Sequence, residues 1–206
     1  MDQQIIEQTI QALRQNKFSA EYFPTMQAAA AELFKIIGTD ASIGFGGSVT
    51  LMDEHLAEKF IERGNTVFDH HPPNQTPEQI LQVRRNQLLC DVFLTSTNAL
   101  TQDGKLVNVD GTGQRVAAMI FGPKKVIVIT GINKITPDLD SALKRLREMA
   151  SPKNNQRLNR PNPCTATGVC HDCNTPTRIC NATTIIEKQP HLSNIHVWIV
   201  GENVGY

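Results

Sequence analysis

Four cysteines near the end of the chain have the residue type and spacing to hold a metal centre. Cys164, Cys170, Cys173 and Cys180 share one stretch with glycine and proline, as expected of a loop that wraps a ligand. Thiolates bind soft metals, and the Cys170–Cys173 pair brings two sulfurs to one centre without strain. The spacing is close to, but differs from, that of plant-type iron–sulfur proteins, so an iron–sulfur cluster is favoured, with zinc as the alternative. Without a metal, the four cysteines would form disulfides or remain free thiols, and a reducing compartment disfavours disulfides.

A glycine-rich segment, residues 44–50, follows a predicted buried strand. Glycines let a ligand approach the backbone, and the N-terminus of a following helix favours an anion. The segment lacks the P-loop lysine and the third glycine of the dinucleotide fingerprint, so no NAD or FAD site is recognised. We interpret it either as a tight capped turn or as an anion site that uses Gly46, Gly47, Ser48 and Thr50.

Further polar residues follow other predicted strands. Asn98, Asp110, Thr112 and Lys134 stand where strands or hairpins end. Ligands of open α/β sheets bind beyond the carboxyl ends of the strands, so we expect these side chains to share a cavity with the glycine loop. Lys134 adds a cation, which predicts a small anionic metabolite, a carboxylate or a phosphate, as the ligand.

Asp69, His70 and His71 also follow a short predicted strand. Adjacent histidines at such a position could transfer protons. Two prolines come directly after them, which favours a plain turn.

The composition restricts the class of protein. Lys+Arg and Asp+Glu are 20 each over 206 residues, so no excess of positive charge predicts binding to nucleic acid or to a membrane surface. The start of the chain shows neither the positive segment nor the apolar run of a signal peptide, and a cytoplasmic location is expected. One domain, residues 1–206, suits this length.

Helical and strand periods alternate along most of the chain, which predicts a mostly parallel sheet covered by helices on both faces. We therefore expect a three-layer α/β/α sandwich, followed by an irregular cysteine-rich loop over residues 151–181 and a final strand. Cys90 ends an apolar helix before a buried strand and is expected in the core. The helices are expected near residues 5–13, 25–37, 50–63, 76–89, 114–121 and from 136; the strands are expected near 22–23, 41–45, 67–68, 91–95, 125–130 and 195–200, with a hairpin around Asp103-Gly104.

Several segments resemble the lactate-utilization (LUD) domain family. They are residues 93–101, Asp103-Gly104, Asp110-Gly111, 123–134, the Gly46-Gly47-Ser48 loop, and the tail over 168–173 and 183–188. The resemblance covers nearly the whole chain. It implies a fold similar to ribose-5-phosphate isomerase, glucosamine-6-phosphate isomerase and CoA transferases. It also implies a role in oxidation of L-lactate to pyruvate, with iron–sulfur partner subunits.

Three functions remain open at this point. The chain is an accessory redox subunit whose cysteine centre relays electrons, or an isomerase- or transferase-like enzyme acting on a phosphorylated or CoA-linked acid, or a binding or sensor module with a structural zinc. Metal analysis and a visible spectrum distinguish the first from the third.

Overall fold

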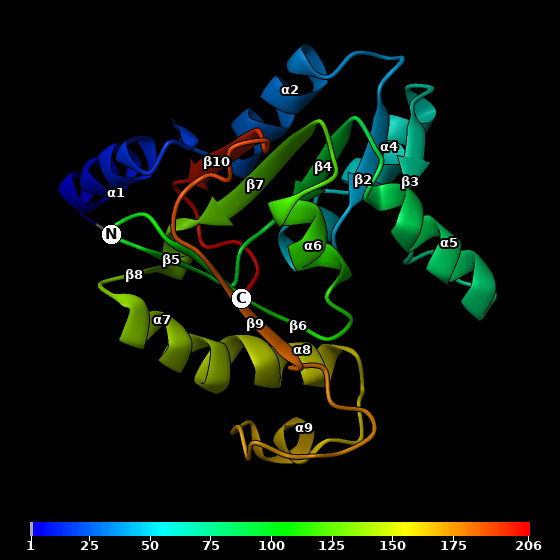
Figure 1. The fold of residues 1–206 in the computed structure, drawn as a ribbon, viewed down its shortest axis with the longest axis vertical. Helices are drawn as coiled ribbons and strands as arrows, with labels where there is room; N and C mark the ends of the chain where they lie inside the picture. Colours follow the sequence, from blue (N-terminus) through cyan, green and yellow to red (C-terminus); the bar gives the residue numbers. More distant parts are fainter. Residues whose placement is uncertain (1) are drawn as a thin grey trace.

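The structure, a computed structural model, describes residues 2–206 and is built around a six-stranded parallel sheet (Figure 1). All neighbouring strands of this sheet run parallel, as the alternation of helical and strand periods predicted. The spatial order is β1 (Ser19–Phe23), β10 (Ile195–Val200), β7 (Lys125–Gly131), β4 (Val92–Thr95), β2 (Ser42–Phe45) and β3 (Thr66–Phe68).

Both faces of this sheet are buried, and alternate residues of one strand belong to different cores. Val126 and Val128 of β7 pack in one core, and Ile127 and Ile129 pack in the other. The first core includes residues of α1 (Gln3–Gln15) and α6 (Gln114–Ile120). The second includes residues of α2 (Met26–Ile36), α3 (Val49–Met52) and α4 (Leu56–Glu62). The predicted three-layer α/β/α sandwich is thereby confirmed.

A second, four-stranded sheet packs against the first core. Its order is β8 (Ile135–Thr136), β5 (Ala99–Thr101), β6 (Leu106–Asp110) and β9 (Ala182–Ile186). The hairpin around Asp103-Gly104 is present, with β5 antiparallel to β6. The sequence did not predict β9, which pairs antiparallel with β6 over its whole length. Its exposed residues, Thr183 and Ile185, and its single buried residue, Ile186, make a weak strand pattern, so pairing with β6 decides its conformation.

The helix α5 (Pro77–Gln87) begins where its sequence predicted. The Thr76 side chain accepts from the backbone of Gln79, and the Gln79 side chain accepts from the backbone of Thr76. This reciprocal capping box and the proline in the first turn define the start of the helix locally.

The helix expected over residues 50–63 is interrupted. It forms α3 and α4, separated at His55, which has a left-handed backbone with φ of 51°. Leu51 and Leu56 are both fully buried although they are five residues apart. Side chains with that spacing lie on different faces of a straight helix, so the break lets both reach the same core.

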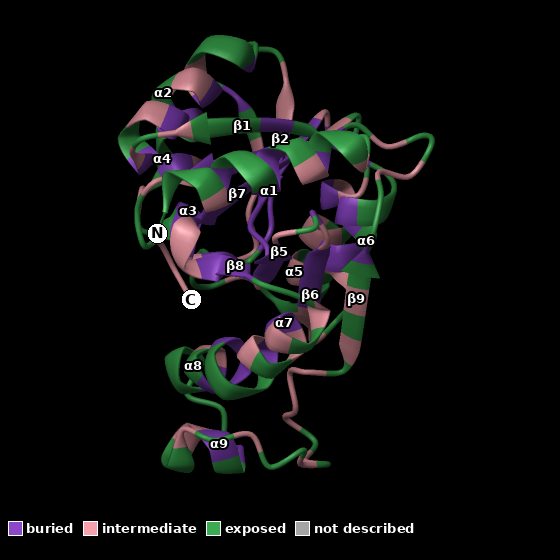
Figure 2. Ribbon diagram, turned by 90° about the vertical axis from the view of Figure 1, so that its left-hand side faces the viewer, coloured by how far each residue is buried: buried purple, intermediate pink, exposed green. Residues whose placement is uncertain are grey.

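The segment expected to be irregular, residues 151–181, begins instead with helix. Helix α7 (Leu139–Arg145) continues through a π-helical turn, Leu146–Ala150, into α8 (Ser151–Arg157), and α9 (Pro163–Thr167) follows. Pro152 stands in the first turn of α8, directly after the π-helical turn, where a missing N–H is tolerated. Figure 2 shows α9 beyond α8 at one end of the molecule, with the cysteine loop beside it.

Candidate functional site

A cavity of about 390 Å³ lies at the carboxyl edge of the parallel sheet. Segments that follow β2, β3, β4 and β7 form its walls, together with the turn after β6 and the region around α8. The predicted residues that line it are Gly47, Ser48, Thr50, Asn98, Asp110, Thr112 and Lys134.

One predicted residue, Gly46, does not line the cavity. It faces the sheet, and a Cβ added there would lie 2.7 Å from the hydroxyl of Thr95. Two further expectations need correction. Asp110 comes from the second sheet rather than from the parallel one. The helix after the glycine loop, α3, spans only four residues, so few aligned peptide dipoles favour an anion there.

Lys134 reaches the cavity from the 3-10 turn after β7 and is only 2% exposed. Its Nζ lies 3.0 Å from the hydroxyl oxygen of Thr50 and 3.0 Å from that of Ser96. Burial, helped by the charges of Arg145 and Arg115, lowers the pKa of Lys134 to about 7. The cation that the sequence predicted therefore loses its proton readily.

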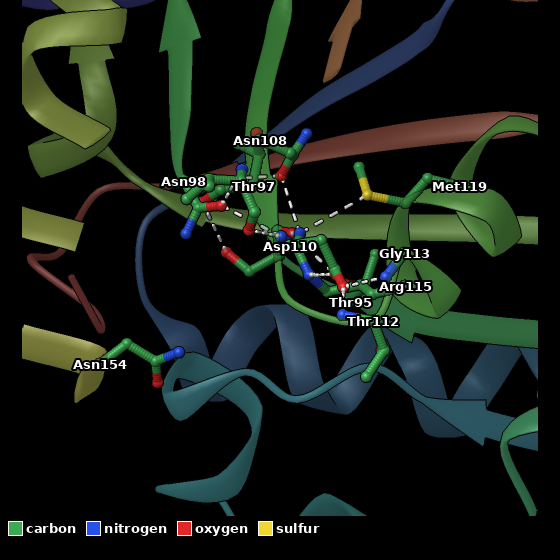
Figure 3. A network of polar contacts seen from close by, with 12 residues as sticks. Thr95, Thr97, Asn98, Asn108, Asp110, Thr112, Gly113, Arg115, Met119 and Asn154 are labelled. Carbon is green, nitrogen blue, oxygen red and sulfur yellow. Dashed lines mark hydrogen bonds and ion pairs between the residues drawn. The ribbon is translucent and has the colours of Figure 1, made fainter. Parts of the chain in front are cut away.

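Asp110 and Asn98 are held by Arg115, which is buried and lies among them in a network of polar contacts (Figure 3). The Arg115 Nε lies 3.2 Å from one carboxylate oxygen of Asp110, and the other oxygen accepts from the backbone N–H groups of Thr112 and Gly113. Arg115 also donates to the side-chain oxygens of Asn98 and Asn108. Asp110 therefore shapes the wall and has little remaining capacity to repel an anion.

Asp69, His70 and His71 face the glycine loop. The Nδ1 of His71 lies 2.5 Å from the Asp69 carboxylate, and the Nε2 of His71 would be 3.3 Å from a Cβ at Gly47. Burial raises the pKa of Asp69, but the hydrogen bond and charge of His71 outweigh it and leave that pKa below its ordinary value. The cavity lining includes both histidines, so the turn that the prolines favoured is also part of the site.

The ring of His70 lies beside the Asp69–His71 pair. Burial lowers the pKa of His70 to about 4, so this ring is neutral at neutral pH. Asp69, His70 and His71 form the only set of three potential ligand side chains within residues 2–206 whose ligand atoms lie within 4.8 Å of one another. The two rings lie against each other in a tilted arrangement, with centroids 4.2 Å apart and planes at 34°.

The cavity holds more positive charge than the sequence predicted. Arg84, Arg157 and Arg160 line it in addition to Arg115 and Lys134, whereas Asp110 is the only acidic side chain among the described residues that line it. Two lining donors, the Nε of Arg84 and the Nε2 of Gln114, are buried and have no acceptor among the described residues. Arg84 lines the cavity, whereas the adjacent Arg85 is exposed, and only the fold decides which of the two turns inward.

The four tail cysteines lie in one neighbourhood. Burial raises the pKa of Cys164, and charge on Cys173, Cys170 and Cys180 would raise it further, so the thiols are close enough to interact. No three of their sulfurs lie within 4.8 Å of one another. The fifth cysteine, Cys90, is 1% exposed in the core, as predicted.

Polar side chains hold the cysteine loop in shape. Arg178 donates to the carbonyl oxygens of Cys173 and Cys180 and pairs with Asp172. The side chain of Asn162 donates to one backbone carbonyl of the loop and accepts from two of its threonines. The backbone N–H of Asp172 points to the sulfur of Cys170 at 3.5 Å. The loop conformation is therefore supported mainly by contacts of Arg178 and Asn162 that do not use the thiols.

The LUD domain family matches residues 6–200 of this sequence. The chain belongs to the LUD domain family. The resemblance predicted from the strand-end motifs and the tail is thereby confirmed, and the chain is a lactate-utilization-type protein. A DUF162 family protein from Deinococcus radiodurans has a similar structure, with a TM-score of 0.53 at 12% identity over 96% of this chain and 97% of that one. At this identity the likeness supports the fold alone. A search of curated proteins found no match.

Two adjacent glycines of this LUD domain allow a matched test of the cavity wall. Gly46→Ala should lower the free energy of unfolding by roughly 1–3 kcal/mol, because its Cβ would press on Thr95 and the Phe93 ring. Gly47→Ala should change stability by no more than about 0.5 kcal/mol. Because its methyl group would stand against His71, it should weaken anion binding instead. Urea denaturation and pyruvate titration of both variants measure this, and equal destabilisation would contradict the assignment.

None of the helices within residues 2–206 of this LUD chain is both long and apolar enough to cross a bilayer.

Proposed function

We propose that this LUD protein binds a small carboxylate, of the lactate or pyruvate type, in the cationic cavity and carries an iron–sulfur centre on its four tail cysteines. In this proposal it acts as an accessory subunit in oxidation of L-lactate to pyruvate, together with iron–sulfur partner subunits. The observation that carries the proposal is the charge of the cavity, which is lined by four arginines and by a single acidic side chain that is already paired with Arg115.

The cavity offers an anion specific hydrogen-bond donors as well as charge. Arg84 Nε and Gln114 Nε2 are buried without acceptors, and leaving such donors unpaired costs about 1–3 kcal/mol each. A carboxylate in the cavity can accept from such donors. His71, oriented by Asp69, keeps its Nε2 toward the glycine loop, where it can accept the hydroxyl proton of a 2-hydroxy acid.

The tail residues fit a centre larger than one ion. A tetrahedral zinc with Zn–S bonds of about 2.3 Å holds its sulfurs roughly 3.8 Å apart. The four thiols share a neighbourhood, no three of their sulfurs lie within 4.8 Å of one another, and four thiolates are the ligand set of iron–sulfur clusters. The N–H group that points to the Cys170 sulfur is of the kind that tunes cluster potentials. When bound, such a cluster supplies one-electron transfer.

One segment of the chain belongs both to the cysteine loop and to the wall of the cavity. Ile179 lines the cavity and is bonded directly to Cys180. The backbone N–H of the next residue, Asn181, donates to the carbonyl oxygen of Asp110. This link connects one cysteine of the proposed redox centre to the wall of the cavity, which supports a role in electron relay.

Anaerobic purification followed by metal analysis and visible spectroscopy tests the metal centre. We expect iron, acid-labile sulfide and charge-transfer absorption, all lost in Cys170→Ser and retained in Cys90→Ala, whose thiol lies in the core. Zinc without absorption would support the structural-zinc module instead. Protein free of any metal would remove the centre from the proposal.

The carboxylate site is tested separately with two adjacent arginines. Arg84→Met should weaken binding of lactate and pyruvate roughly 10- to 100-fold, since hydrogen bonds to charged groups contribute about 1.5–3 kcal/mol. Arg85→Met should leave binding unchanged, because Arg85 is exposed on the other side of α5 and does not line the cavity. Titration calorimetry measures both, and equal affinities would exclude Arg84 from the site.

The Asp69–His71 pair favours one alternative, an isomerase- or transferase-like enzyme. A histidine oriented by a carboxylate can move protons on a phosphorylated or CoA-linked acid without redox chemistry. Titration of ribose 5-phosphate and CoA beside lactate and pyruvate separates the two functions by which ligand binds more tightly.

A further inference from the structure

The hydrogen-bond partners of the Lys134 amine are those that suit an uncharged amine. Its two neighbours are hydroxyl groups, and each can donate its own hydrogen bond to a backbone carbonyl. Thr50 donates to the carbonyl oxygen of Val204 and Ser96 donates to that of Thr97, both at 3.4 Å. The two hydroxyl oxygens can therefore accept from Nζ at 3.0 Å. A neutral amine has two N–H bonds and one lone pair, so these acceptors satisfy both N–H bonds and leave the lone pair free.

No carboxylate stabilises the charged form of this amine. Within residues 2–206 no ion pair includes Lys134. The charged groups that act on it are Arg145 and Arg115, from the two helices α7 and α6, and both repel a proton. Burial, together with these two charges, lowers the pKa of Lys134 to about 7, and roughly half of the amine is unprotonated at neutral pH.

We propose that Lys134 is a nucleophile that forms an imine with the carbonyl carbon of a 2-oxo acid bound in the cavity. The amine lone pair forms the C–N bond, the carbonyl π electrons pass to oxygen, and that oxygen leaves as water with the two amine protons. The Ser96 and Thr50 hydroxyls, in contact with Nζ, relay these protons. The step needs no oxidant, and hydrolysis reverses it. Desolvated lysines among cationic neighbours are activated in this way in enzymes.

The cavity favours a 2-oxo acid over a simple ketone or aldehyde. Arg84 and the other lining arginines attract a carboxylate, and in a 2-oxo acid the carbonyl carbon is bonded directly to that carboxylate. A cavity of about 390 Å³ leaves room for a pyruvate-sized molecule and for larger 2-oxo acids. This inference rests on the proposed function in one respect, because it needs the carboxylate to bind in the cavity.

Reductive trapping tests the imine. The full-length protein is incubated with pyruvate and sodium cyanoborohydride, and the intact mass is measured. We expect one adduct, with a gain equal to pyruvic acid minus one oxygen atom, and peptide mapping should place it on Lys134. Lys153→Met, which removes an exposed lysine, should still form the adduct. Lys134→Met should lose it. Below pH 7 the trapping rate should fall about tenfold per pH unit as the amine becomes protonated.

The results distinguish this inference from the proposed function. Pyruvate binding is measured independently by calorimetry without reductant. Binding without an adduct, or an adduct mapped to exposed lysines, would overturn the role of Lys134 and leave the carboxylate site intact. Absence of binding to the wild-type protein would overturn both. Peptide mapping on the wild-type protein decides the site even if Lys134→Met fails to fold.

Discussion

Arg115→Met should lower the free energy of unfolding by about 3–5 kcal/mol, the cost of removing one partner from a buried ion pair. Arg115 is buried, and its Nε lies 3.2 Å from the carboxylate of Asp110, which is itself only 9% exposed. The same guanidinium donates to the side chains of Asn98 and Asn108 and to the Val109 carbonyl. Methionine fills similar space but leaves a buried carboxylate and several acceptors without a donor.

The matched control for this substitution is an exposed ion pair. Lys35→Met removes the partner of Glu32, at 3.2 Å, from a lysine whose side chain is 75% exposed. Such pairs contribute less than about 1 kcal/mol. Urea denaturation monitored by circular dichroism measures both variants. A loss below about 1 kcal/mol for Arg115→Met would show that the network behind the cavity does not hold the wall together.

Lys134→Met should remove a large pH dependence of stability. The pKa of Lys134 in the folded protein is about 7, against an ordinary value of 10.5. Between these values the unfolded chain holds a proton that the folded chain has released. Stability of the wild type therefore rises with pH across this window, by roughly a kcal/mol for each pH unit, and falls to its lower plateau below about pH 7.

The difference between wild type and variant isolates this effect from other groups that titrate. Chemical denaturation at several pH values from 6 to 10 should give converging curves, with Lys134→Met more stable at the acidic end, because a buried charge without a carboxylate partner is costly. Lys153→Met, at an exposed position, should follow the wild type. Parallel curves for wild type and Lys134→Met would mean that the amine keeps its ordinary pKa. A stabilised variant would also show that this lysine is kept for function at the expense of stability.

Local sequence signals determined much of this protein. The capping box at Thr76, the turn at Asp103-Gly104 and the apolar run of β7 depend on residues close together in the chain, and each formed where it was predicted. The strand-end motifs also identified the LUD family. Such features can be predicted from the sequence because capping, turn geometry and burial of both faces of a strand depend on only a few neighbouring residues.

Other features were decided only by contacts between distant segments. The final strand, β10, lies between β1 and β7, and β9 is a strand because it pairs with β6. Pro152 is accommodated in a helix because a π-helical turn precedes it. No local period encodes these outcomes, since they depend on which surfaces are available for burial in the folded chain.

Some features of the cavity could likewise be predicted from the sequence, and others depend on the tertiary structure. The sequence indicated Lys134 and the glycine loop because both follow predicted strands, and it indicated the four cysteines by their spacing. It did not indicate that Arg84 turns inward while Arg85 stays exposed, or that Asp110 is held by Arg115. The protonation state of Lys134 also could not be predicted from the sequence. A lysine keeps its proton in water, and only the tertiary structure removes the water and places two arginines, but no carboxylate, around it.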